Sequence, residues 1–462
     1  MAMIHNDIQG QPLWNDNGVV CREESTRNKV DFFEKYAFIV TIIACVICDA
    51  GHSISGLVIV AAFAVLILKP EYLLAPILFF SIFDDYLLMG TGSSISRFLT
   101  LYFIAGAAFL ILKRGTIKKE SLLLAALIPL GVILSLYSIF GKTKIPTSYI
   151  LNVVLAITIM NISPSNNKKI VTQIHTFAIL AVVYVYYMLA KNGFDSLVDG
   201  SRMTIAHEVN SNQLAMGLAI AMALLASDLL IFGKHKVLNI VLMLVNCIAL
   251  FLTGSRTGLI AGIAAIFLLF IVATNEKGKR YKAILFSVLG ATIFIFVYSY
   301  LQENFPLLME RFTVENVEET GGTGRLDVWK AYFEHYFSKY WLIGIGFSSE
   351  NMYYAALSIN GEGHGAHNLV VEIISKTGLV GVVLYGVCFL KYFKTAFKCV
   401  RENRFILCSI AIVFSILVNG IGENTLTVRF LWFGIGLGYL LSNSIENKQT
   451  CLGGENGCRK AE

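Results

Sequence analysis

Residues 361–381 read GEGHGAHNLVVEIISKTGLVG, and this stretch changes character halfway along. It begins as a polar, glycine-rich loop that carries His364 and His367, and it continues without a break into an apolar helix. An apolar helix directly after a polar loop is typical of a segment that enters a membrane. Ionisable side chains are costly at such a border and usually have a function there. The stretch therefore predicts a membrane protein with a functional group where this span begins.

The composition of the 462-residue chain agrees with that class. Hydrophobic residues make up 56% and charged residues 15%, and the mean hydropathy is +0.67. Soluble domains carry about a quarter charged residues, so we expect a polytopic membrane protein. The net charge of +6 does not indicate a nucleic-acid partner, because the cations lie in short loops between apolar segments. The polar first residues lack the apolar stretch of a cleaved signal peptide, so none is expected.

Apolar segments follow one another along most of the chain. Several are shorter than the roughly 20 residues that a helical span needs, so we expect an all-α fold with about 12–14 transmembrane helices. The fourteen segments are 36–50, 54–68, 72–90, 98–112, 121–140, 149–162, 174–190, 212–232, 237–252, 257–273, 283–301, 369–390, 405–421 and 426–441.

Charge in the short loops predicts how these spans are oriented. If the first residues lie in the cytoplasm and the spans alternate, the inner loops carry most of the lysines and arginines, as the positive-inside rule requires. The expected regions are a cytoplasmic tail (1–35), a transmembrane bundle with a small outer loop at 191–211 (36–301), a large outer loop (302–366), the last transmembrane helices (367–441) and a second cytoplasmic tail (442–462).

The large outer loop is too long to be only a connection, and loops of this length usually carry function. Within it, the sequence RLDVWKAYFEHYFSKYW predicts an amphipathic helix that lies on the membrane surface or covers the transmembrane bundle. The apolar residues at helical spacing are Leu326, Trp329, Phe333, Tyr336, Phe337 and Tyr340. Aromatic side chains of this kind also stack against sugar rings.

Three cations recur at the outer boundary of the predicted membrane region. Arg256 lies in FLTGSRTGLIAG between two spans, Arg325 precedes the amphipathic helix, and His367 opens the span after the large loop. Each alone has an ordinary explanation as an interfacial anchor, a surface charge or a polar helix end. Together they fit a phosphate-bearing substrate, because arginine binds phosphate oxygens in a forked geometry and a neutral imidazole accepts a proton near pH 7.

Two pairs of charged residues and the absence of metal-binding motifs bear on function next to these cations. Asp84 and Asp85 form an adjacent acidic pair, read either as a metal or glycosyltransferase pair or as polar residues at a membrane boundary. Glu372 and Lys376 stand one helical turn apart and are expected to pair. The large loop contains no HExxH motif, no Cys/His cluster and no DxD motif, so no metal centre is predicted. No spacing among the nine cysteines indicates metal ligands or disulfides.

The small outer loop contains GSRMTIAHEVNSNQLAMG. Arg202 is a candidate third ligand for a phosphate or a sugar. Asn210 and Asn212 are candidates for binding hydroxyl groups, but capping of the following helix is the favoured role for both.

At these residues the sequence resembles the O-antigen ligase/polymerase superfamily of bacterial inner membranes. The resemblance covers about residues 202–441 and rests on SRTG after an apolar span, on TGRLDVW in the large loop and on GIG at Gly344–Gly346. Its most specific element is His367-Asn368, followed nine residues later by GLVG at Gly378–Gly381. This matches the family pattern H-[N/S/Q]-x9-G-x-x-[G/T/Y] and follows the largest outer loop, as it does in the family.

The resemblance implies a metal-independent and cofactor-independent glycosyl transfer from undecaprenyl diphosphate at the periplasmic face. Arg256 and Arg325 match the arginines that bind the diphosphate, and His367 matches the histidine that acts as base or orients the acceptor. Arg202, His364 and Asn368 are weaker candidates for substrate binding. The implied partners are an undecaprenyl-diphosphate-linked oligosaccharide, membrane lipids and a polysaccharide chain-length regulator.

Three functions stay open at this point. A Wzy-type polymerase transfers the growing glycan to a new lipid-linked repeat unit, whereas an O-antigen ligase transfers it to lipid A–core. The polymerase and the ligase share the donor chemistry. The stretches TGRLDVW and RMTIAHEVNSNQ resemble polymerase sequences and favour that function. A transporter of lipid-linked oligosaccharide is the third possibility, but it predicts charges deep in the spans and repeated halves, and the sequence shows neither.

Overall fold

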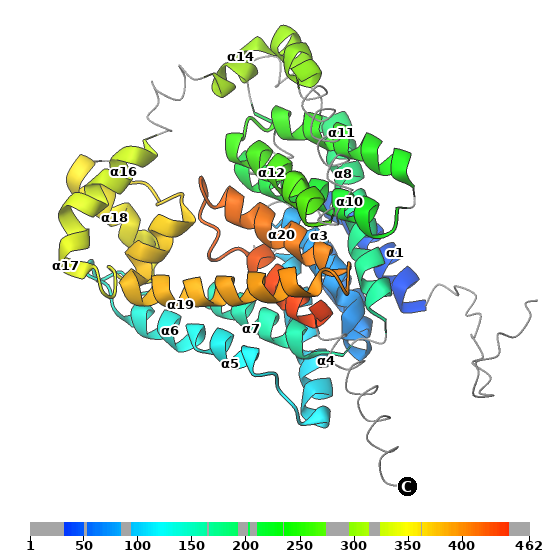
Figure 1. The fold of residues 1–462 in the computed structure, drawn as a ribbon, viewed down its shortest axis with the longest axis horizontal. Helices are drawn as coiled ribbons and strands as arrows, with labels where there is room; N and C mark the ends of the chain where they lie inside the picture. The colour runs from blue at the N-terminus through cyan, green and yellow to red at the C-terminus, as the bar shows by residue number, and fades with distance from the viewer. Residues whose placement is uncertain are drawn as a thin grey trace, which may run out of the picture.

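The computed structural model describes residues 32–49, 53–84, 94–163, 166–192, 202–203, 210–233, 235–273, 295–313, 324–361 and 363–442. Helices make up 81% of the structure, and no strand is formed within these ranges. The chain is an all-α polytopic membrane protein, as the composition predicted. Figure 1 shows a packed bundle of helices with a smaller lobe at one side, formed by α16, α17 and α18.

The bounds of the helices are as follows. The first half contains α1 (Phe32–Asp49), α2 (Ser53–Phe63), η1 (Ala64–Leu68), η2 (Pro70–Leu73), α3 (Leu74–Ile82), α4 (Ile95–Arg114), α5 (Glu120–Ala125), α6 (Leu127–Leu136), α7 (Thr147–Asn161), α8 (Asn167–Asn192) and α10 (Ser211–Ile231). The second half contains α11 (Lys236–Leu252), α12 (Arg256–Ala273), a helix at 295–304, α14 (Pro306–Met309), η3 (Glu310–Phe312), α16 (Arg325–Tyr332), the π-turn η4 (Phe333–Phe337), α17 (Ser338–Tyr340), α18 (Ser349–Asn360), α19 (Leu369–Cys399), α20 (Ile406–Asn419) and a last helix at 429–442.

Five helices in the described ranges are long and apolar enough to cross a membrane, namely α4, α8, α10, α12 and α19. Shorter apolar helices lie at six further places, among them α7, α11 and α20. Most of the predicted segments therefore form helices, but the predicted segment 121–140 is divided into α5 and α6 and ends at Leu136. Most of the predicted span 283–301 lies outside the described residues.

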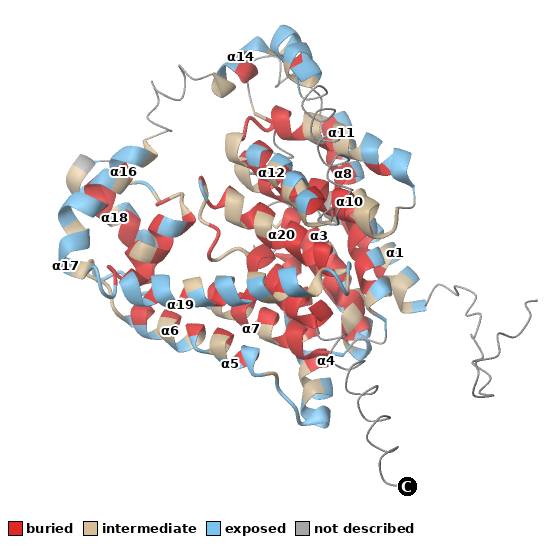
Figure 2. Ribbon diagram, in the orientation of Figure 1, coloured by how far each residue is buried: buried red, intermediate tan, exposed pale blue. Residues whose placement is uncertain are grey.

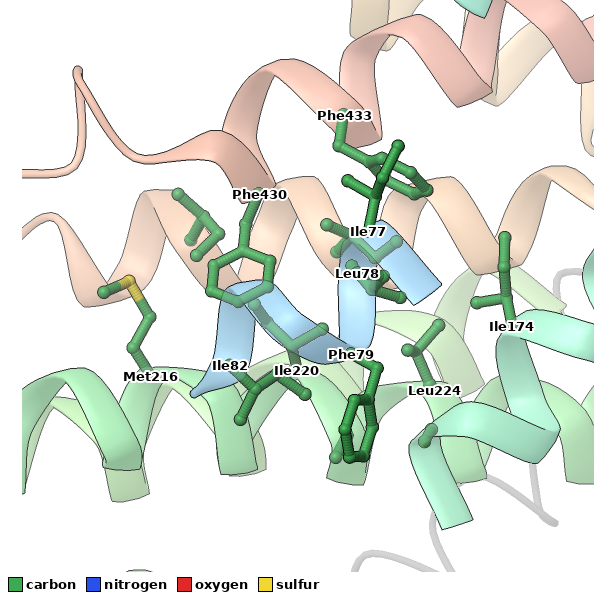
Figure 3. Packing of buried hydrophobic residues seen from close by; sticks show 14 of the residues in the cluster. Ile77, Leu78, Phe79, Ile82, Ile174, Met216, Ile220, Leu224, Phe430 and Phe433 are labelled. Carbon is green, nitrogen blue, oxygen red and sulfur yellow. The ribbon is translucent and has the colours of Figure 1, made fainter. Parts of the chain in front are cut away.

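The centre of the bundle is built around α10, which is apolar along most of its length and has 78% of its most apolar 18 residues buried. Small residues allow the neighbouring α12 to approach closely, since a Cβ on Gly258 would lie 2.6 Å from that of Ala215. The buried residues of Figure 2 concentrate around α3, α10 and α20. Figure 3 shows α3 between α10 and the last helix, with Ile82 near Ile220 and Phe430.

The lobe has a hydrophobic cluster of its own, separate from that of the bundle. Val328 and Tyr332 of α16 are buried there against residues of α18 and the start of α19. The predicted amphipathic helix is present, but its apolar stripe is only partly directed inward. Trp329, Tyr336 and Tyr340 pack against the cluster, whereas Leu326, Phe333 and Phe337 are exposed.

A break in α19 joins the lobe to the bundle. Gly378 has φ 57°, ψ −157°, which interrupts the helix between its first residues and its long second part. The segment 341–346 fills the gap: the Leu379 amide donates to the Trp341 carbonyl at 2.8 Å, and the Ile345 amide donates to the Ser375 carbonyl at 2.7 Å. Gly378 of the GLVG motif and Gly344 of the GIG motif therefore allow a close backbone contact.

Candidate functional site

Four segments that are distant in the sequence meet where the lobe faces the bundle. They are the start of α12 with Arg256, the start of α16 with Arg325, the start of α19 with His367, and the irregular segment 420–428 that carries Glu423. In Figure 1 the orange connection after α20 faces the yellow lobe. The contacts below show that this region gathers most of the cations predicted from the sequence.

His367 is held in an unusual backbone conformation. Its φ is 45°, in the left-handed region that residues other than glycine rarely adopt. Its neighbours fix this geometry, because Asn368 caps α19 by accepting from the amides of Val370 and Val371, and Trp329 Nε1 donates to the Ala366 carbonyl at 2.6 Å. Strain of this kind persists only when surrounding contacts enforce it, and it is frequent at functional sites.

The carboxylate of Glu423 connects His367 to Arg325. Glu423 Oε2 lies 3.3 Å from His367 Nδ1, and Glu423 Oε1 accepts from Arg325 Nη2 at 3.3 Å. The Glu423 side chain is 12% exposed, compared with 23% for Arg325 and 36% for His367. The histidine is therefore the most accessible member of the three, and its ring is anchored through one nitrogen.

Arg202 reaches the same carboxylate through an amide side chain. Arg202 Nη2 donates to Asn212 Oδ1, and Asn212 Nδ2 donates to Glu423 Oε1 at 2.6 Å. Arg202 Nε also donates to the Thr253 carbonyl at 2.7 Å. Asn210 caps α10, as predicted, but the expected capping role of Asn212 is wrong, since its side chain bridges Arg202 and Glu423.

A further arginine, Arg311, joins this group. Arg256 Nε donates to the Arg311 carbonyl at 2.5 Å, and Gly254 lies between Arg311 and Arg202, with a Cβ there 3.3 Å from Arg311 Cδ. Arg311 Nε is buried and has no hydrogen-bond partner among the described residues. A buried donor without a partner is unfavourable, so an anionic ligand at this position would satisfy it.

The electrostatics of the site agree with an anion-binding role. The pKa of the Arg202 guanidinium is lowered to about 10, first because the group is buried and then because Arg311 lies nearby. The carboxylate of Glu423 acts in the opposite direction on this pKa, and Arg325 lowers it. Arg325 contacts the one carboxylate and Arg202 reaches it through Asn212, while Arg256 and Arg311 lie beside these arginines. The excess positive charge favours a ligand with at least two negative charges.

Two weaker candidates for substrate binding, His364 and Asn368, have other surroundings or roles in the structure. His364 lines a separate cavity of 390 Å³ between α16 and α18, together with Asp327 and His335. The Asn368 side chain donates to the Ile421 carbonyl at 2.9 Å in addition to capping α19. Within the described ranges, no group of three or more His, Cys, Asp and Glu side chains could hold a metal ion.

Asp84, the first residue of the acidic pair at Asp84 and Asp85, has a role that neither sequence interpretation predicted. Asp84 Oδ2 accepts from Arg429 Nη1 at 3.2 Å, and Arg429 Nη1 also donates to Ser81 Oγ at 2.9 Å. Asp84 therefore neutralises a buried arginine of the last helix. Asp85 lies outside the described residues.

Sequence reasoning missed Arg311 and Glu423. Arg311 lies among the polar residues of the large loop with no motif around it. Glu423 had a detectable signal, because it follows a second GIG triplet at Gly420–Gly422 in an otherwise apolar region. Gly422 is needed there, since a Cβ would lie 2.3 Å from Thr257 Cγ2 and 2.9 Å from Arg325 Nη1.

The comparisons with known proteins agree with this geometry. A family model described as O-antigen ligase matches residues 238–386, a segment that contains Arg256, Arg311, Arg325 and His367. Neither the comparison with curated proteins nor that with solved structures gave a match. The match covers about a third of the chain and supports a relationship of this segment to the O-antigen ligase/polymerase superfamily.

Proposed function

We propose that the protein is a surface-polysaccharide polymerase of the Wzy type. It transfers the growing glycan from undecaprenyl diphosphate to a hydroxyl group of a new lipid-linked repeat unit. The acceptor oxygen forms a bond to the anomeric carbon, the bond from that carbon to the diphosphate oxygen breaks, and the diphosphate leaves with the electron pair. The proton of the acceptor hydroxyl passes to His367. The observation that carries the proposal is the arginine cluster that shares a carboxylate with this histidine.

The roles of the residues follow from their chemistry. Arg256 and Arg325 hold the diphosphate through charge-assisted hydrogen bonds, which strengthen as negative charge develops on the leaving group. Arg202 and Arg311 line the same positive region. His367 is the most exposed member of the Arg325–Glu423–His367 group, so its free ring nitrogen is available to an acceptor hydroxyl.

Localisation follows from the substrate. A polyprenyl lipid stays in the bilayer while its diphosphate and sugars extend into water, so the reacting groups must lie at a membrane border. We place the protein in the bacterial inner membrane with the site facing the periplasm and both termini in the cytoplasm, which the distribution of loop cations supports. A chain-length regulator is a proposed partner.

Transfer to lipid A–core, the ligase reaction, is the second candidate. It uses the same donor chemistry, and the matching family model carries the description O-antigen ligase. We favour the polymerase because TGRLDVW in the large loop and RMTIAHEVNSNQ in the small loop resemble polymerase sequences.

Deletion of the gene and analysis of the lipopolysaccharide by size separates these functions. A polymerase mutant carries lipid A–core with a single repeat unit and no ladder. A ligase mutant carries core without any repeat unit and accumulates lipid-linked polymer. An unchanged ladder would contradict both assignments for lipopolysaccharide. The same test with the His367→Ala variant distinguishes loss of catalysis from loss of the protein, provided that membrane insertion is verified by immunoblotting.

A further inference from the structure

Glu423 lies in a segment whose backbone is fixed from several sides. Residues 420–428 have no regular structure, yet their carbonyls and amides are bonded to three neighbouring helices, α7, α19 and the last helix. The bonds are those of the Leu369 amide with the Gly420 carbonyl (2.6 Å), Asn368 Nδ2 with the Ile421 carbonyl (2.9 Å), the Leu426 amide with Glu372 Oε2 (3.2 Å), Asn152 Nδ2 with the Thr427 carbonyl (2.8 Å) and Trp432 Nε1 with the Leu426 carbonyl (2.8 Å). The carboxylate is therefore presented by a rigid support.

The Glu423 carboxylate faces three groups that can donate hydrogen bonds, on Asn212, Arg325 and His367. Oε1 accepts from Asn212 and Arg325, and Oε2 faces Nδ1 of His367 at 3.3 Å. An ionised carboxylate only accepts hydrogen bonds. The contact consequently requires a proton on His367 Nδ1, which leaves Nε2 without a proton when the imidazole is neutral.

The two oxygens of Glu423 thus serve two parts of the site. Oε1 belongs to the arginine cluster, which is electrostatically linked to Arg202 as well as Arg325. Oε2 belongs to the histidine. One carboxylate therefore contacts both an arginine of the cluster and the histidine.

We propose that Glu423 is a positioning residue that sets the tautomer of His367 and stabilises its protonated form during glycosyl transfer. This inference rests on the proposed function.

When a diphosphate occupies the arginines, Arg325 exchanges the carboxylate for the phosphate oxygens, and Glu423 remains on His367. The acceptor hydroxyl gives its proton to Nε2, the ring becomes an imidazolium, and the Nδ1 proton stays in the hydrogen bond to Glu423. Water takes the Nε2 proton after transfer. Carboxylates orient catalytic and metal-bound histidines in the same way elsewhere.

Glycosyl transfer by the full-length protein in proteoliposomes tests the inference, with undecaprenyl-diphosphate-linked repeat units as donor and acceptor. Glu423→Ala should lower the turnover number at saturating donor by about 100-fold, the loss expected when a general base is no longer positioned. The KM for the donor should change by only about threefold. Glu423→Asp should retain part of the activity, and added formate should restore part of it to Glu423→Ala.

The controls separate positioning from stability. Glu350→Ala removes an exposed carboxylate from α18 and should leave turnover unchanged. Formate should not restore His367→Ala, and Glu423→Ala combined with His367→Ala should lose no more than His367→Ala alone, because both residues act in one unit. The thermal midpoint of each variant, measured in detergent, reports on folding.

The outcomes are distinct. If the wild-type protein transfers no glycan, the proposed function fails. If the wild-type protein is active and Glu423→Ala keeps turnover within about threefold, the positioning role fails while the proposed function stands. If Glu423→Ala is inactive but formate and Glu423→Asp restore nothing and the thermal midpoint falls, Glu423 is a structural residue and the inference is overturned. Rescue by formate without a change in the midpoint supports it.

Discussion

Gly378 lies against the backbone of Leu342, so closely that a Cβ on Gly378 would be 2.4 Å from the Leu342 carbonyl carbon and oxygen. This contact seats the 341–346 segment in the break of α19. The first residues of α19, which begin two residues after His367, thus take their direction from the lobe rather than from the second part of the same helix. The spacing of nine residues between Asn368 and Gly378 is the length of this short first part.

Substitution of Gly378 by alanine should therefore unfold this junction. The alanine would need φ +57° and would overlap with the Leu342 carbonyl, which together cost about 3 kcal/mol. We expect a lower thermal midpoint in detergent and no polymer in cells. Gly386→Ala in the same helix is the matched control, because a Cβ there meets nothing within 4 Å and alanine favours a helix. Equal stability of the two variants would contradict the role of Gly378.

Removal of one partner of the buried ion pair between Glu372 and Lys376 should strongly destabilise the folded protein. Lys376 Nζ lies 2.6 Å from Glu372 Oε1, and the two side chains are 6% and 2% exposed. Glu372→Ala leaves a buried ammonium without a partner and should cost about 3–5 kcal/mol. Glu372→Gln with Lys376→Met removes both charges and should cost less. The exposed pair Lys330–Glu334, at 3.9 Å, has the same spacing, and its removal should change the midpoint little.

The sequence predicted the helical class and most helices because apolar periodicity and loop charge report directly on burial in a membrane. It also predicted the ion pair of Glu372 and Lys376, since their spacing alone brings them together. It could not predict the break at Gly378 or the inward face of α16. Both depend on which segment packs against them. Tyr332 and Phe333 are adjacent aromatic residues, yet only Tyr332 is buried.

The site was predicted in part for a similar reason. Arg256, Arg325 and His367 stood out because cations at a membrane border are uncommon, and the structure brings Arg325 and His367 to one carboxylate. Glu423 was not assigned to the site, and capping was favoured for Asn212, because the role of each depends on contacts with residues far away in the chain. His364 was a candidate through its closeness to His367 in the sequence, but it lines a different cavity.

Arg325→Ala should abolish polymer formation while the protein still inserts. Loss of one preorganised donor to a developing oxyanion typically lowers the rate by about 10²–10³-fold. Arg325→Lys should also be poorly active, because an ammonium cannot bind two phosphate oxygens in a forked geometry. Arg256→Ala should behave like Arg325→Ala. Lys339→Ala removes an exposed cation from the same lobe and should leave the polymer ladder intact. Normal polymer from Arg325→Ala would contradict diphosphate binding by this residue.

Inorganic pyrophosphate should stabilise the purified protein. Burial and the nearby Arg311 lower the pKa of Arg202 to about 10, and an anion in the cluster offsets both effects because it stabilises the charged guanidinium. A ligand at about 100 times its Kd stabilises the folded state by about 2.7 kcal/mol, which a thermal-shift measurement detects. Chloride at equal ionic strength should give a smaller shift, and Arg202→Ala and Arg256→Ala should each weaken the pyrophosphate effect. An undiminished shift in both variants would place the anion elsewhere.

His367 and His235 offer a matched pair, because both are left-handed, with φ 45° and 52°. Glycine adopts this region freely, whereas other L-residues lose roughly 1–2 kcal/mol there. His235→Gly should raise the thermal midpoint and keep full activity, since His235 caps α11 away from the site. His367→Gly gains the same relief but loses its contact with Glu423. It should stay within about 1 kcal/mol of the wild-type stability and make no polymer. Polymer formation by folded His367→Gly would show that His367 is not the base. A large loss of stability would show instead that its ring holds the start of α19 in place.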